Sequence, residues 1–236
     1  MITAKYFSIP SILLLIIFAS ACMQQATTTT TTLLSSTGKE VSFVTEDDIK
    51  IFATYWDRGT GKKLILLHML NGDRNDWNSF AESIPYTAIA IDLRGHGESD
   101  GDWRSFSDTD FNNMILDVKA ATKFLGEGKI IVIGASIGAN VALNYASKND
   151  VAGVILLSSG LDYRGVKTEE AMKKYNGPVL VVASEDDAQS FSASQTLYSL
   201  ATGKKEIKTY KDAGHGMNMF AKQDLDDVIL QFVGNV

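Results

Sequence analysis

The chain has 236 residues, a formal net charge of −6 and a single cysteine. Hydrophobic residues make up 45% of it and charged residues 21%, which excludes a wholly disordered chain, a collagen-like fibre and a protein of many membrane spans. The acidic balance argues against a nucleic-acid partner, because binding phosphates requires clustered Lys and Arg. One cysteine also excludes an internal disulfide and a thiolate metal cluster. We therefore expect one globular domain held together by packing.

The N-terminus has the parts of a secretory signal peptide. Lys5 precedes an apolar run from Ile12 to Ala19, and small residues then lead to Cys22. The run is shorter than the roughly 20 apolar residues of a spanning helix, and this arrangement is typical of cleaved leaders. The Ala-Ser-Ala-Cys sequence resembles the lipobox of bacterial lipoproteins, with Ala19 where Leu is more usual. The resemblance implies a signal peptide over residues 1–21, lipidation of Cys22, and anchoring of an exported protein in the cell membrane or envelope. A signal peptidase site with an incidental cysteine is the alternative.

A polar segment separates this N-terminus from the rest of the chain. It is rich in Gln, Thr and Ser and includes consecutive threonines from Thr27 to Thr32. Such a stretch has too little apolar surface to offset the entropy of ordering. We therefore expect a tether over residues 22–38 and a catalytic domain over residues 39–236.

The apolar pattern of this domain predicts its fold. Val41–Thr45 and Lys50–Trp56 alternate with period two around an acidic turn, which indicates an antiparallel hairpin. Nearly unbroken apolar runs follow, typical of parallel strands buried on both faces: Lys63–His68, Thr87–Asp92, Lys129–Gly134, Val151–Leu157 and Pro178–Ala183. Helical spacing lies between and after them, over Phe111–Leu125, Ile137–Lys148, Ser190–Ala201 and Asp224–Val233. We predict an α/β protein: a three-layer α/β/α sandwich with a mostly parallel sheet, an N-terminal antiparallel edge hairpin, and a site at the carboxyl ends of the strands.

A Gly-x-Ser-x-Gly motif, Gly134-Ala-Ser136-Ile-Gly138, follows one of these apolar runs and opens a predicted helix. A strand–turn–helix elbow strains its central residue, and glycines on either side let the turn close. The Ser136 hydroxyl would then enter a cleft, with the Ile137 N–H at a helix N-terminus where it can stabilise an oxyanion. A glycine-rich turn without chemistry is the alternative.

A serine nucleophile needs a base, and the chain has three histidines. His68 and His96 both precede the serine, whereas His215 lies between two glycines, after the last candidate strand, Lys205–Lys211. Such a loop can bring an imidazole over the sheet edge, so we expect His215 to be the base. The strand over Pro178–Ala183 ends in Ser-Glu-Asp-Asp, which supplies carboxylates able to orient the imidazole.

The order Ser136, acid, His215, together with the elbow and the segment Asp-Leu-Arg-Gly-His-Gly-Glu-Ser at 92–99, resembles the α/β-hydrolase superfamily over residues 39–236. The family pattern G-x-x-D, here with Ser in place of Gly, implies Asp187 as the acid and Asp186 as its nearest rival. Members with the acid one strand earlier would use Asp162.

The resemblance also implies a second oxyanion donor, the backbone N–H of Leu70, although Met69 replaces the expected glycine. We expect the Arg94–Ser99 segment to be a structural turn rather than a substrate contact, and Trp77 and Trp103 to lie in the core, with a position in the pocket as the alternative.

The stretch between Ser158 and Pro178 holds one expected helix, around Thr168–Tyr175, which is too little for a cap domain. The resemblance therefore implies an open site, as in compact carboxylesterases and dienelactone-hydrolase-like enzymes, with Ser in place of the latter's Cys. No phosphate loop or metal-ligand motif is present, so we predict no cofactor and no metal.

We thus expect a serine hydrolase that cleaves small-molecule carboxylic esters through an acyl-enzyme intermediate, with no obligate protein partner. An acyltransferase or serine peptidase with the same triad, or a non-catalytic binding protein on this fold, is the alternative.

Overall fold

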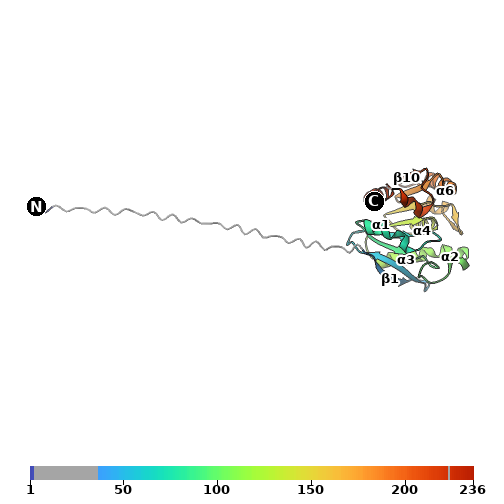
Figure 1. Cartoon of the computed structure of the whole chain (residues 1–236), viewed down its shortest axis with the longest axis horizontal. Helices are drawn as coiled ribbons and strands as arrows, with labels where there is room; N and C mark the ends of the chain where they lie inside the picture. Colours follow the sequence, from blue (N-terminus) through green and yellow to red (C-terminus); the bar gives the residue numbers. More distant parts are fainter. Residues whose placement is uncertain (3–36, 223) are drawn as a thin grey trace. The chain divides into compact units, whose positions relative to one another are not determined.

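A computed structural model describes residues 1–2, 37–222 and 224–236 (Figure 1). The expected signal peptide, Cys22 and nearly all of the expected tether lie outside the described residues. Contacts divide the chain into Met1–Leu33 and Leu34–Val236, and all described helices and strands belong to the second unit. In the described part of the chain, no helix is long and apolar enough to cross a membrane.

One eight-stranded sheet forms the centre of the domain, in the order β1-β2-β4-β3-β5-β6-β9-β10. Its strands are β1 (Lys39–Val44), β2 (Lys50–Trp56), β3 (Lys62–Leu67), β4 (Thr87–Ile91), β5 (Lys129–Ala135), β6 (Gly153–Leu157), β9 (Val179–Ser184) and β10 (Lys205–Tyr210). β2 pairs antiparallel with β1 and β4, and all other pairs are parallel. The predicted α/β sandwich with an antiparallel hairpin at the sheet edge is confirmed.

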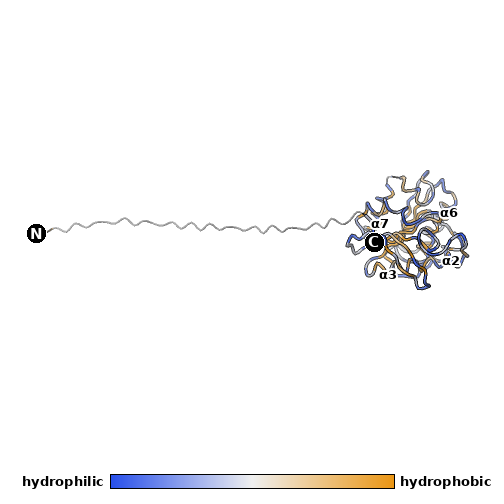
Figure 2. The backbone as a smooth tube through the Cα atoms, turned by 60° about the horizontal axis from the view of Figure 1, so that its bottom comes forward, coloured by the Kyte–Doolittle hydropathy of each residue, from blue (hydrophilic) through white to orange (hydrophobic). Residues whose placement is uncertain are grey.

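Helices cover both faces of the sheet. They are α1 (Asn78–Ser83), α2 (Asp108–Asn112), α3 (Met114–Leu125), α4 (Ile137–Ala146), α5 (Glu169–Lys174), α6 (Ala188–Leu200) and α7 (Leu225–Gly234), with 3₁₀ turns η1 (Arg74–Trp77), η2 (Trp103–Ser105) and η3 (Gly216–Ala221). Side chains of α3–α6 join one core cluster, and those of α1 and α7 join the other. Figure 2 shows hydrophobic segments concentrated inside the domain.

Alternate residues of the central strands enter the two cores. In β3, Ile65 and Leu67 pack in one cluster, and Leu64 and Leu66 in the other, all fully buried. Burial of each such side chain contributes about 1.5–3 kcal/mol. Both faces must therefore be apolar, which explains the unbroken runs in the sequence.

One predicted helix is divided in two. The pattern over Phe111–Leu125 indicates a single helix, but α2 begins earlier and ends before Asn113, where α3 follows. Ser107 and Asp110 form a capping box, which satisfies the first N–H groups and starts a helix upstream of the apolar pattern.

The connection from β6 to β9 is short, as expected. It holds a two-stranded hairpin, β7 (Asp162–Tyr163) and β8 (Val166–Lys167), and then α5. Asn140 on α4 secures it, because its side-chain N–H donates to Val166 O at 2.8 Å and its oxygen accepts from the Gly160 N–H at 3.0 Å. This connection contains no separate cap domain.

Candidate active site

Ser136 lies in the turn between β5 and α4 with a strained backbone, φ 55° and ψ −119°. A non-glycine residue in such a conformation costs on the order of 1–3 kcal/mol. The turn is held by the Ser136 N–H, which donates to Leu157 O at 2.8 Å. The residue is 8% exposed and is therefore largely buried.

The two glycines of the motif allow close backbone packing at this turn. A Cβ on Gly134 would lie 2.2 Å from Gly138 O, and a Cβ on Gly138 would lie 2.6 Å from both His68 O and Leu67 O. α4 therefore begins in direct contact with the loop of residues 68–73, hereafter the β3 loop. Ile137 is the first residue of α4, where a backbone N–H lacks an intrahelical acceptor and the helix dipole is positive.

His215 belongs to the loop of residues 211–217, hereafter the histidine loop, which follows β10. Its Nδ1 lies 2.6 Å from Asp187 Oδ2. Because a carboxylate accepts, Nδ1 carries the proton, and in the neutral ring Nε2 keeps its lone pair. In the described part of the chain, the hydrogen bonds of this side chain reach Asp187 and Ser190 but not Ser136. The structure thus joins the expected base to the expected acid, with the hydrogen bond to the serine unformed.

The three candidate acids occupy different environments. Asp186 accepts from the Ser184 hydroxyl and, at 3.2 Å, from the Gly214 N–H; the Ser184 bond lowers the pKa of Asp186. Asp162 accepts from the Gly165 N–H at 2.8 Å within the β7–β8 turn. Of these acids, only Asp187 contacts the imidazole. Asp186 instead secures the histidine loop.

Ser190 is a neighbour of the imidazole that the sequence interpretation missed. Its hydroxyl, on a residue 1% exposed, lies 3.2 Å from His215 Nδ1 and 2.8 Å from the Tyr163 hydroxyl. Because α6 starts directly after Asp187, residues 187 and 190 share one face of its first turn. The i, i+3 spacing of an acid and a serine was the available signal.

His68 orients the peptide that carries the expected Leu70 donor. Its Nδ1 lies 2.6 Å from Met69 O and must donate, while its Nε2 accepts from the Leu93 N–H at 3.0 Å. These bonds require the neutral ring, and burial lowers the pKa of His68 to about 3. Met69 O and Leu70 N–H belong to one planar trans peptide, so the N–H points away from His68. Among the described residues, that N–H has no hydrogen-bond partner.

Met69, which replaces the expected glycine, packs against the histidine loop. Its sulfur accepts from the Met217 N–H at 3.4 Å, and a Cβ on Gly216 would lie 2.4 Å from that sulfur. The thioether therefore fills the space left by Gly216 and connects the β3 loop to the histidine loop.

The Arg94–Ser99 segment is mainly a structural turn around buried Asp92, as expected. The Asp92 carboxylate accepts from the Arg74 N–H at 2.7 Å and the Glu98 N–H at 3.0 Å, and the Ser99 hydroxyl donates to Asp92 O at 2.7 Å. Within this segment, Gly95, His96 and Gly97 also line a cleft.

The two tryptophans differ. Trp77 is fully buried, as predicted, whereas Trp103 is half-buried and lines the cleft beside Leu70. The core prediction is therefore wrong for Trp103. Its ring stacks on His96, with centroids 5.7 Å apart and planes at 8°, and the Arg104 guanidinium lies 4.9 Å above it. These polar partners hold the ring at the surface.

The sheet order, the strained serine elbow and the histidine loop define the α/β-hydrolase fold, and residues 62–173 match the family model of the alpha/beta hydrolase fold. A putative 2-succinyl-6-hydroxy-2,4-cyclohexadiene-1-carboxylate synthase of Haemophilus influenzae is 34% identical over 114 residues, 45% of this chain and 43% of that relative. An esterase of Mycobacterium tuberculosis is 25% identical over 164 residues, 68% of this chain and 53% of that protein. The chain thus spans about half the length of these relatives or less.

Solved structures share the fold. A Pyrococcus furiosus esterase superimposes with a TM-score of 0.69 at 20% identity, over 84% of this chain and 92% of its own. A membrane phospholipase A described as a bacterial virulence factor gives 0.72 at 15% identity, over 85% and 87%. An esterase from Exiguobacterium antarcticum gives 0.71 at 14% identity, over 83% and 100%. At these identities, the likeness shows the fold alone.

Proposed function

We propose that the protein is a serine hydrolase that cleaves carboxylic esters of small molecules through an acyl-enzyme intermediate. The observation that carries the proposal is the 2.6 Å contact between Asp187 Oδ2 and His215 Nδ1. This contact fixes the tautomer in which Nε2 can accept a proton. Ser136, at the carboxyl end of β5 in the same sheet, is the nucleophile that such a base would serve.

In the proposed reaction, Ser136 Oγ attacks the ester carbonyl carbon while Nε2 of His215 takes the hydroxyl proton. The tetrahedral intermediate collapses, the carbon–oxygen bond to the alcohol breaks, and His215 returns the proton to the leaving oxygen. Water then attacks the acyl-enzyme with the same base and releases the acid. Asp187 stabilises the imidazolium formed in each half-reaction.

The N–H groups of Leu70 and Ile137 are the proposed oxyanion donors. The support is their position: the β3 loop touches the start of α4 at Gly138, and the Leu70 N–H has no partner among the described residues. Loss of one such donor in other hydrolases typically costs about 10²–10³ in kcat.

Hydrolysis of p-nitrophenyl esters from C2 to C12 by the full chain tests the proposal, with Ser136→Ala beside it. We expect turnover that peaks at one acyl length and a loss in the variant of at least about 10³-fold, because triad residues act as a unit. Unchanged turnover in the variant would exclude the mechanism. Turnover only with an added alcohol or amine acceptor would favour an acyltransferase, and cleavage only of peptides a peptidase.

The neighbouring aspartates provide a matched pair of variants for the acid. Asp187→Asn should lower kcat by about 10⁴-fold, because an amide beside Nδ1 favours the wrong tautomer. Asp186→Asn removes the same charge one residue away and should retain activity within about tenfold of wild type. A large loss of kcat in Asp186→Asn, with activity retained in Asp187→Asn, would instead identify Asp186 as the acid of the triad.

We also propose that the chain is exported and anchored in the membrane through a lipid on Cys22. The support is the sequence alone, since a small-residue site and this cysteine follow the apolar N-terminal run. Metabolic labelling with an alkyne fatty acid should mark the wild-type protein in the membrane fraction. Absence of label in wild type, or label that survives Cys22→Ser, would contradict the anchor.

A further inference from the structure

A cleft of about 400 Å³ lies beside the β3 loop, between Leu70 and the turn of residues 95–104. Leu70 is both a lining residue of this cleft and the proposed oxyanion donor. An ester whose carbonyl oxygen accepts from the Leu70 N–H therefore has one end next to the cleft. The chemistry of the walls indicates what that end contains.

The walls are polar. The polar residues Asn71, Asp73, Asp102 and Arg104 line the cleft together with several glycines. Among the described residues, the backbone N–H groups of Asn71 and Gly97 have no hydrogen-bond partner. Leu70 and Trp103 are the hydrophobic residues of the lining. Such walls offer many hydrogen bonds and little surface for an alkyl chain.

The charges of the cleft do not favour an ionic ligand. Arg104 is paired with Asp102 at 3.3 Å, and Asp73 adds a second carboxylate, so the cleft has one cation against two carboxylates, a balance that does not favour a phosphate or carboxylate ligand. The Trp103 ring already contacts His96, with centroids 5.7 Å apart, and the Arg104 guanidinium, 4.9 Å from the ring centroid, so an ammonium group would compete with an existing cation for this ring. Hydroxyl groups, which both donate and accept, match this mixed wall.

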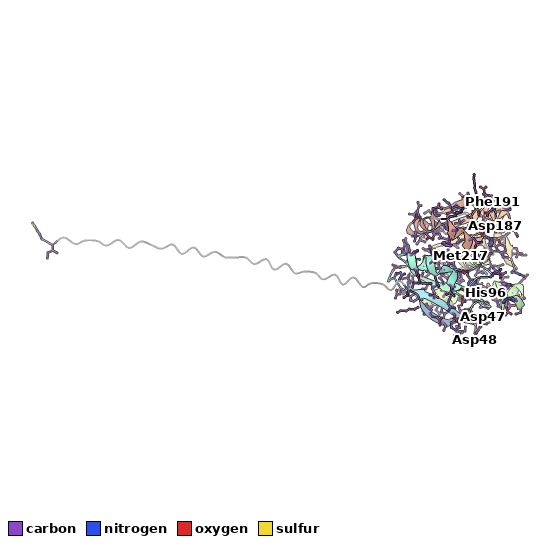
Figure 3. All side chains as sticks on the ribbon, in the orientation of Figure 1. Asp47, Asp48, His96, Asp187, Phe191 and Met217 are labelled. Atoms are coloured by element: carbon purple, nitrogen blue, oxygen red, sulfur yellow. The ribbon has the colours of Figure 1, made fainter. Side chains whose placement is uncertain are left out.

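The cleft is connected by a hydrogen bond to the residue that carries the proposed oxyanion donor. His96, which is 4% exposed and lines the cleft, lies with Nε2 2.8 Å from Leu70 O. In the view of Figure 3, the label of His96 lies below that of Met217 and the label of Asp187 lies above it.

We propose that this cleft binds the uncharged, hydroxyl-rich alcohol portion of the substrate, such as a glycerol or sugar group esterified to the acid. This inference rests on the proposed function, because it assigns one side of that same site. Bond cleavage follows the proposed mechanism, with the polyol as the alcohol that leaves with the proton from His215.

A comparison of esters with one common acyl group tests the proposal. The full chain is assayed by pH-stat with glyceryl monobutyrate, butyl butyrate and butyrylcholine. Two additional hydroxyl contacts predict a kcat/KM for glyceryl monobutyrate about tenfold or more above that of butyl butyrate. A preference for butyl butyrate or butyrylcholine, or equal values, would overturn the inference. No turnover of these esters or of p-nitrophenyl butyrate would instead overturn the proposed function.

Variants of Asn71 connect any preference to the cleft. Asn71→Leu should lower the ratio of the two kcat/KM values toward one, whereas Asn71→Ser, which keeps a hydroxyl, should retain most of it. Both esters use the same oxyanion donors, so the ratio is insensitive to a general disturbance of the β3 loop. Asn235→Leu, an exposed position at the end of α7, is the matched control and should leave the ratio unchanged. A ratio that survives Asn71→Leu would place polyol recognition elsewhere.

Discussion

Protonation of His68 should weaken the folded state between pH 6.5 and 3. The ring is fully buried, its Nδ1 donates to Met69 O, and its Nε2 accepts from the Leu93 N–H. A proton on Nε2 would face the Leu93 N–H, so two hydrogen-bond donors would point at each other and this hydrogen bond would be lost. The unfolded chain therefore takes up the proton first, and stability falls as the pH drops below 6.5.

The shift of the His68 pKa gives the size of the effect. A fall from 6.5 to about 3 corresponds to a total loss of about 5 kcal/mol, reached only when the pH falls below the folded pKa, at about 1.4 kcal/mol per pH unit. At pH 5, where only part of that range has been crossed, the same linkage gives a loss of about 2 kcal/mol relative to pH 7.5.

Urea unfolding of wild type and His68→Asn at pH 7.5 and 5 measures this loss. An asparagine can still donate to Met69 O but does not titrate, so the advantage of wild type over the variant should shrink by about 2 kcal/mol at pH 5. The difference between proteins cancels the titration of other groups. A gap that is the same at both pH values would refute the buried neutral ring.

Three further substitutions test contacts at and near the site. Gly138→Ala adds a Cβ 2.6 Å from backbone oxygens, so it should destabilise the fold by about 1–3 kcal/mol in urea unfolding and reduce esterase turnover; unchanged stability would contradict the close packing. Ser190→Ala removes a neighbour of His215 Nδ1 and should lower kcat for the p-nitrophenyl esters; an unchanged kcat would show that the Ser190 hydroxyl does not help to orient the ring. Asn140→Leu breaks two buried hydrogen bonds and should lower the free energy of unfolding by about 2–3 kcal/mol, whereas a loss below 0.5 kcal/mol would show that the β6–β9 connection does not need them.

The sequence predicted the sheet well because buried parallel strands leave an unmistakable pattern. The run Thr87–Asp92 corresponds to β4, and Pro178–Ala183 to β9, each within about one residue of the observed ends. Chemistry at the strand ends was also readable, since the elbow needs its glycines and the histidine follows the last strand. The start of α2 at Asp108 was missed, because the capping box of Ser107 and Asp110 sets it rather than apolar periodicity; the apolar pattern also gave no sign of the break at Asn113.

The details of the site could not be predicted from the sequence, because they depend on the directions in which side chains point. Asp186 and Asp187 are adjacent in sequence, and their separate tasks depend on where α6 begins. The expected helix started at Ser190, two residues later than the observed start at Ala188, which concealed the shared face of Asp187 and Ser190. The cleft beside Leu70 was likewise hidden, because the position of Trp103 depends on contacts with two residues of the same turn.

Chemical labelling tests the central claim, that Ser136 is a nucleophile activated by His215, most directly. The full chain is treated with a fluorophosphonate, and the modified peptide is located by mass spectrometry. The account predicts one label on Ser136, lost in Ser136→Ala and slowed at least about 10³-fold in His215→Ala. Absence of label in wild type, or label on another serine, would contradict it.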